Sequence, residues 1–180
     1  MSKVLVILLN LAALVGFTTS HAADEAMSPA EIAVKAALTP PYSEERNAAS
    51  AFVGTQNFYI GRMALTCKPL LGQPDTFPSK LVAIWQAANA PYYRASVIYQ
   101  SDLLKSIPDA TAQALIAENI RNSVRTSGQG AVNDQLKGPD EDKTKVCKNF
   151  VVLAADGNFN ITEKTPFFST LQDLVKEFDK

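Results

Sequence analysis

Signals that start and stop helices stand at almost every boundary along this chain, and they constrain its fold more than any other feature. The first helix begins with a capping box between Ser28 and Glu31 and ends near Leu38, before two adjacent prolines. Similar signals recur along the chain and predict an all-α bundle of six or seven helices. The predicted helices span 29–38, 44–66, 79–88, Pro91 to at least Leu103, Asp109 to Gly128, Pro139 or Asp140 to Gly157, and Thr165 or Pro166 to Phe178.

Apolar residues recur at helical spacing within these segments and predict which face of each helix is buried. In the fourth segment, Tyr92 and Tyr99 mark one stripe, and Asn89 is the expected N-cap. In the fifth segment, Gly128 is the expected end, and residues 129–138 form a polar loop. The final segment carries its apolar stripe at Phe168, Leu171, Leu174, Val175 and Phe178.

Residues 150–162 allow two interpretations. Apolar residues from Val146 through Phe150 recur at helical spacing and predict a helix that Gly157 ends. The pair Asp156-Gly157 between two short apolar runs is also a turn signal for a β-hairpin. We expect the helix because its period runs unbroken back to Val146, and a short hairpin stays the alternative.

The N-terminal segment Met1–Ala22 has the pattern of a cleaved signal peptide. An apolar run follows Lys3 and is shorter than the roughly 20 residues needed to cross a bilayer. Small residues at Ser20 and Ala22 place the cleavage site after Ala22. We therefore expect a periplasmic or secreted protein, with residues 23–180 as a single helical domain and no stable membrane anchor after cleavage.

The only histidine of the chain, His21, leaves with this segment. The mature protein then lacks imidazole for Ser-His-Asp or Cys-His catalysis, for metal binding and for pH switching. The sequence also lacks a G-x-S-x-G elbow, a P-loop and a Rossmann glycine fingerprint. We expect no catalytic residue, no metal site and no cofactor.

The two cysteines, Cys67 and Cys147, form an even pair in a chain predicted to be exported. Such a pair is most often a disulfide in an oxidising compartment. The alternative is a redox pair, but the C-x-x-C spacing that tunes a thiolate is missing. A bridge would join the end of the second helix to the middle of the sixth and stabilise the fold by about 4–5 kcal/mol in the chain-entropy model.

The net charge of the chain limits the classes of partner that it can bind by electrostatic attraction. The chain has 17 Lys and Arg residues and 18 Asp and Glu residues, and cleavage removes Lys3, which leaves a formal net charge of −2. A negative balance favours neither nucleic acid nor an anionic membrane as a partner. We therefore expect no nucleic-acid binding, and the oligomeric state stays open.

A cluster of aromatic residues and an arginine flanks the helix break at Pro91, and it is the candidate binding site. Aromatic and arginine side chains often carry binding energy in protein interfaces. Tyr92 and Tyr93 lie about 100° apart on a helix, so both cannot point into the same core. Core packing is the competing explanation. The candidate binding residues are Trp85, Tyr92, Tyr93 and Arg94.

The predicted function is a non-catalytic protein-binding domain of the bacterial periplasm, such as an inhibitor, an immunity protein or a chaperone-like adaptor. Its partner would be another envelope or secreted protein. One alternative is a carboxylate-dependent hydrolase acting on envelope glycans, for which Glu44, Glu45 and Glu118 are candidates. A second alternative is a carrier of small apolar ligands, suggested by abundant alanine and by residues 167–168, both phenylalanine.

Overall fold

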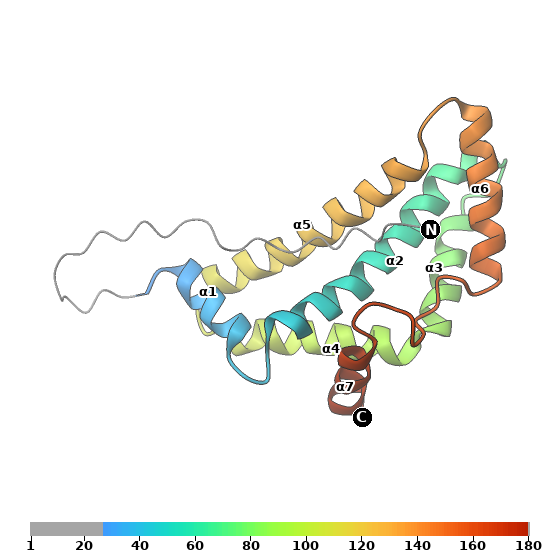
Figure 1. Cartoon of the computed structure of the whole chain (residues 1–180). Coiled ribbons are helices and arrows are strands. Elements are labelled where there is room, and N and C mark those ends of the chain that lie inside the picture. Colours follow the sequence, from blue (N-terminus) through green and yellow to red (C-terminus); the bar gives the residue numbers. More distant parts are fainter. Residues whose placement is uncertain (1–26, 180) are drawn as a thin grey trace.

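The computed structural model describes residues 27–179, and this part of the chain contains seven α-helices. These residues contain no strand, so the all-α prediction is confirmed (Figure 1). The predicted signal peptide, residues 1–22, lies outside the described residues. The helices are α1 (Pro29–Leu38), α2 (Glu44–Leu70), α3 (Phe77–Ala88), α4 (Ala90–Ser106), α5 (Ala110–Gln135), α6 (Asp140–Ala155) and α7 (Phe168–Phe178).

The first two helices begin at the residues that the capping signals predict. The Ser28 hydroxyl accepts from the Glu31 backbone N–H at 3.3 Å, and the Glu31 carboxylate accepts from the Ser28 N–H at 2.8 Å. The Ser43 hydroxyl accepts from the Arg46 N–H at 3.2 Å. Each hydroxyl satisfies a backbone donor that the first helical turn leaves without a partner.

Helix α2 is the centre of the fold, because each of the other helices packs against it. Helix α5 lies beside α2 and runs in the same direction, whereas α4 runs in the opposite direction (Figure 1). The side chains between these helices form one main apolar core. Its largest fully buried members include Tyr99, Phe150, Ile60, Met63, Leu171 and Leu174.

The predicted end of the fifth helix at Gly128 is wrong, because α5 continues to Gln135. A Cβ atom at Gly128 would lie 2.5 Å from Cδ1 of Phe58 on α2. The glycine therefore serves the close approach of α2 and α5, and it does not act as a helix terminator. The chain turns instead near Gly138, which has a φ of +91°.

A disulfide joins Cys67 to Cys147, as the cysteine pair predicts. The two residues lie 80 positions apart in sequence, and both are fully buried. The bond connects the last turns of α2 to the middle of α6. It therefore fixes α6 against the central helix, on the side where α3 also packs.

Helix α6 ends in a Schellman motif, so the hairpin alternative for residues 150–162 is wrong. The Gly157 N–H donates to the Ala154 carbonyl at 3.3 Å, and the Asn158 N–H donates to the Leu153 carbonyl at 2.9 Å. Gly157 has the positive φ, +73°, that this motif requires. The Asp-Gly pair thus ends a helix, because the preceding residues keep their helical hydrogen bonds.

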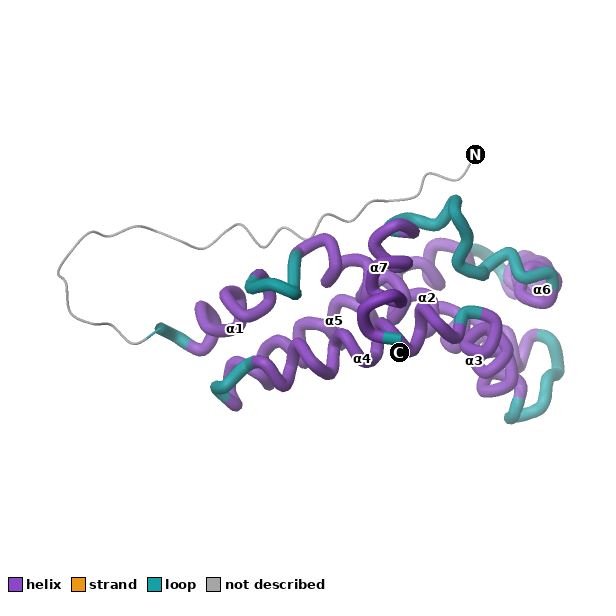
Figure 2. Tube along the Cα trace, turned by 90° about the horizontal axis from the view of Figure 1, so that it is seen from below, coloured by secondary structure: helices purple, strands orange, loops and turns teal. Residues whose placement is uncertain are grey.

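The C-terminal helix α7 lies across α4 and α2 (Figure 2). Its predicted apolar stripe is confirmed, since Leu171 and Leu174 are fully buried. The helix begins at Phe168, later than predicted, because Phe167 takes a left-handed conformation with φ of 62°.

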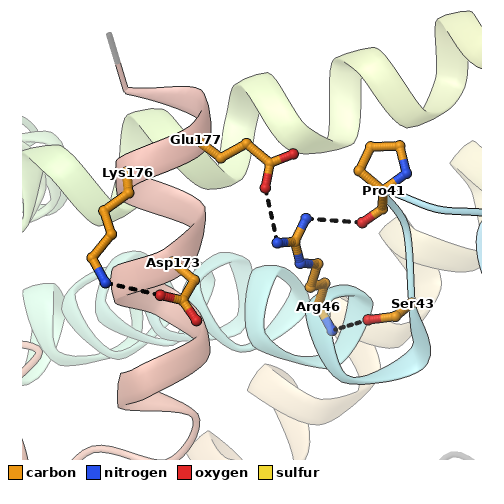
Figure 3. A network of polar contacts seen from close by, with 6 residues as sticks. All are labelled: Pro41, Ser43, Arg46, Asp173, Lys176 and Glu177. Atoms are coloured by element: carbon orange, nitrogen blue, oxygen red, sulfur yellow. Dashed lines mark hydrogen bonds and ion pairs between the residues drawn. The ribbon is translucent and has the colours of Figure 1, made fainter.

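Arg46 of α2 ties the start of its own helix to α7 (Figure 3). Its guanidinium donates to the Pro41 carbonyl at 2.9 Å and lies 2.8 Å from the Glu177 carboxylate. The Thr170 hydroxyl of α7 donates a second contact of this kind, to the Glu45 carboxylate of α2. Helix α7 is therefore attached to the body by polar contacts as well as by its apolar face.

Candidate functional site

Trp85, the first of the predicted binding residues, packs in the core and is 4% exposed. Its indole N–H donates to the Phe159 carbonyl at 2.9 Å. The side chain therefore holds the segment that follows α6 against α3.

Asn89 occupies the N-cap position of α4, as predicted, but its side chain makes no capping hydrogen bond. The buried amide donates to the Trp85 carbonyl at 2.8 Å and to the Asn160 side chain at 3.2 Å. Its oxygen accepts from the Ile161 N–H at 2.7 Å. Asn89 thus fixes the segment after α6, a role that depends on residues about 70 positions away.

Tyr92 and Arg94 both face α7. The Tyr92 ring centroid lies 6.2 Å from that of Phe168. The Arg94 guanidinium donates to both oxygens of the Asp179 carboxylate, at 2.8 and 2.9 Å. These hydrogen bonds raise the pKa of Arg94 and lower the pKa of Asp179 from their ordinary values. The two residues attach the C-terminal helix to α4.

Tyr93 lies on a different side of α4, as the 100° rotation between neighbouring helical residues requires. Its ring packs edge-on against Trp85, with 6.5 Å between centroids. Its other side lines a groove that sequence inspection did not single out. Of the four predicted binding residues, only Tyr93 lines this groove.

The groove lies between α4 and α5, with α2 as its floor. Helices α4 and α5 are joined by the short connection 107–109 and diverge from it, and both pack against α2 (Figure 1). The groove has a volume of about 300 Å³, at the lower end of the range typical of binding sites. Its lining consists of Val53, Gly54, Asn57, Phe58, Tyr93, Ser96, Val97, Gln100, Ile120, Arg121 and Val124.

The walls of this α4–α5 groove are mostly apolar and open to solvent. Val97 on α4 is 50% exposed, and Ile120 and Val124 on α5 are partly buried opposite it. Residues 120 and 124 lie one turn apart on α5 and belong to an apolar stripe of that helix. The structure shows that this part of the stripe borders the groove, because no described side chain fills the space.

Polar groups lie among the apolar side chains where α4 meets the α2 floor of the groove. The Gln100 amide donates to the Ser50 hydroxyl at 2.8 Å, and that hydroxyl donates to the Ser96 carbonyl at 3.2 Å. The Ser96 hydroxyl is buried and has no hydrogen-bond partner within the described residues. A buried hydroxyl without a partner costs about 1–3 kcal/mol. The α4 side of the groove therefore contains one buried hydroxyl that the described residues leave without a hydrogen bond.

Gly54 lies where α5 approaches α2 closely beside the groove. A Cβ atom at this position would lie 3.2 Å from Cγ2 of Val124, so a larger residue would press against the α5 wall. Together with Gly128 one turn further along the contact, this glycine lets α5 approach α2 closely. The α5 wall therefore lies close against the α2 floor, and the α4 wall diverges from it.

A second hollow, of about 110 Å³, lies between α3 and the end of α6 and includes Ile84 and Phe159 in its lining. No Asp or Glu of the described residues lines either hollow. Two of the three candidates for a hydrolase form contacts with other side chains, since Glu45 accepts from Thr170 and Glu118 pairs with Arg121. The hydrolase and carrier alternatives stay predictions.

Residues 27–179 contain no group of three or more His, Cys, Asp or Glu placed to hold a metal ion. None of the helices described is both long and apolar enough to cross a membrane. Comparisons with protein-family models, with curated proteins and with solved structures found no match for this chain.

Proposed function

We propose that this chain is an exported, non-catalytic protein-binding domain of the bacterial periplasm, and that the α4–α5 groove binds a segment of another envelope or secreted protein. The observation that carries the proposal is an apolar groove open to solvent, with Val97 half exposed on one wall. Protein interfaces concentrate binding energy where a few apolar side chains enter such a depression. An inhibitor, an immunity protein or a chaperone-like adaptor needs this kind of surface.

The buried disulfide supports export. Disulfides persist in oxidising compartments such as the bacterial periplasm and are rare in the cytosol. Cys67 and Cys147 are both fully buried, and the bond joins helices far apart in the chain. A structural bridge of this kind suits a scaffold that must stay folded outside the cytosol.

The composition of the groove supports a protein segment as its ligand. An inserted apolar side chain would cover Val97, Ile120 and Val124 and remove their surface from water. Gln100 of α4 and Asn57 of α2 add amide groups to the same lining. A peptide offers apolar side chains together with backbone N–H and C=O groups, so it complements both parts of this lining.

The proposal is tested by replacing Val97, because its side chain forms an exposed part of the wall. We expect Val97→Gln to abolish retention of a specific protein from an envelope extract of the producing cells. Val152 of α6 is the matched control, since it is 55% exposed and lines neither hollow. Val152→Gln should retain the same protein as the wild type.

Two results would overturn the proposal. One is an extract from which the wild-type protein retains nothing stoichiometrically. The other is a retained protein that binds Val97→Gln as well as it binds Val152→Gln. Thermal unfolding of both variants, followed by circular dichroism, checks that each is folded at the binding temperature.

A further inference from the structure

Arginine is the only charged residue type in three helical segments that contribute to the α4–α5 groove, and Glu118 lies one position before the α5 segment. These segments are residues 46–66 of α2, 90–101 of α4 and 119–133 of α5, and they contain no Asp, Glu or Lys. The whole chain has 18 acidic residues and a formal net charge of −1, whereas the charged side chains of these three segments are all positive. The arginines are Arg46, Arg62, Arg94, Arg121 and Arg125.

Helix α7 neutralises two of these arginines on the side of the molecule that it covers. Arg46 pairs with Glu177 at 2.8 Å, and Arg94 pairs with Asp179 at 2.8 Å. Both acidic residues belong to the C-terminal segment, so these charges are satisfied within the fold. They do not contribute to an unmatched positive surface.

The other three arginines lie along the α5 wall and the adjoining part of α2. Arg121 lines the groove, and Arg125 lies one turn further along the same side of α5. Arg62 lies one turn beyond Phe58 on α2 and donates to Gln129 of α5 at 2.7 Å. This wall is therefore apolar at its centre and positive along its edge.

These three arginines are weakly matched by acids. Within the described residues, Arg62 and Arg125 form no ion pair. Arg121 pairs with Glu118 at 2.7 Å, and more than half of each side chain is exposed. Exposed pairs of this type contribute little to stability, so an incoming carboxylate can compete for Arg121.

From this charge distribution we propose that the groove binds an acidic amphipathic peptide segment of its protein partner. Apolar side chains of the segment enter between α4 and α5, and its carboxylates contact Arg121 and Arg125. Arginine can hold a carboxylate through two parallel hydrogen bonds, which gives orientation as well as attraction. This inference rests on the proposed function, because it specifies the ligand of the same groove.

The test uses a random peptide library displayed on phage and selected against the full mature protein. Selected peptides are synthesised, and their affinities for the wild type and for variants are measured by fluorescence anisotropy at low and high salt. Arg121→Gln with Arg125→Gln removes the positive edge. Lys80→Gln with Lys148→Gln is the control, because it removes the same charge from exposed positions on α3 and α6.

We expect the selected peptides to be rich in Asp and Glu next to bulky apolar residues. The arginine double variant should lower their affinity about tenfold or more, and the lysine double variant should leave it unchanged. High salt should weaken binding to the wild type and have little effect on the arginine variant. Val97→Gln should also weaken binding, because it disturbs the apolar wall.

Different outcomes separate failure of this inference from failure of the proposed function. Neutral or basic peptides that lose affinity for Val97→Gln but not for the arginine variant would overturn the acidic ligand alone. The absence of any peptide sensitive to Val97→Gln would overturn the groove as a protein-binding site. Dimerisation abolished by Val97→Gln, or binding to anionic vesicles lost in the arginine variant, would assign the groove to a second copy or to a membrane and overturn the inference.

Discussion

Helix α4 is covered by α7 on one side and faces the α4–α5 groove on the other. On the side that α7 covers, Tyr99 is fully buried, and its ring packs edge-on against Phe178 with 5.4 Å between centroids. On the side that faces the groove, Val97 is half exposed, and the hydroxyl of the buried Ser96 beside it has no hydrogen-bond partner among residues 27–179. The same helix is thus saturated with contacts where another part of the chain covers it and incompletely satisfied where none does. Unused apolar and polar capacity is what a binding surface offers to a partner.

The largest difference between the two sides should appear when a side chain is truncated. We expect Tyr99→Ala to lower the free energy of unfolding by about 3–5 kcal/mol, because it empties a large buried volume. Val97→Ala should change it by no more than about 0.5 kcal/mol, because the side chain is already half exposed. Urea unfolding followed by circular dichroism measures both. Equal losses for the two variants would contradict the comparison.

An intermediate effect is expected where α5 touches the floor of the groove. In Gly128→Ala the new methyl group meets the Phe58 ring at 2.5 Å, and we expect a net loss of about 1–2 kcal/mol as overpacking outweighs the gain in helix propensity. Gly130 of the same helix has no atom within 4 Å of the added Cβ. Gly130→Ala should therefore stabilise the protein by about 0.5–1 kcal/mol.

These two glycine variants are compared by thermal unfolding under identical conditions. A shift of the melting temperature in opposite directions is the expected result. If both variants were stabilised, the α2–α5 contact at Gly128 would not be tight, and the wall of the groove would not depend on it.

The smallest effect concerns the hydroxyl group on the covered side. Burial raises the pKa of Tyr99 from 10.0 to about 12, and its hydroxyl donates to the Asn47 side chain at 2.7 Å. The Tyr99 hydroxyl therefore stays protonated in the folded state at a pH where it loses its proton in the unfolded state. This contribution to stability is complete below pH 10 and is lost as the pH rises towards about 12.

Tyr99→Phe isolates this contribution. We expect it to cost about 1 kcal/mol at neutral pH, through the lost hydrogen bond. Its free energy of unfolding should also fall less steeply than that of the wild type between pH 10 and 12. Parallel alkaline slopes for the two proteins would show that the Tyr99 hydroxyl is not buried.

Most helix boundaries could be predicted from the sequence, because capping residues and prolines act within a few positions of one another. The capping box at Ser28 and the end of α6 at Gly157 are examples. Gly128 and the side chain of Asn89 were misjudged for the opposite reason. Their roles depend on Phe58 and on the segment at residues 160–161, which are far away in sequence.

The candidate site was only partly predictable. The 100° rotation between Tyr92 and Tyr93 predicted that they face different surroundings, and the structure places one against α7 and the other at the groove. Val97, Gln100 and Arg121 had no signal in the sequence. Their juxtaposition arises because α4 and α5 diverge over α2.

The sequence by itself determined the helical class, the places where most helices begin and the pair of cysteines available for a bridge. Those features depend on local backbone chemistry and on residue identity. Only the tertiary structure decided which side of α4 is covered and which arginines have acidic partners. Glu177 and Asp179 come close to Arg46 and Arg94 only after α7 folds back over the body, and no local pattern encodes that approach.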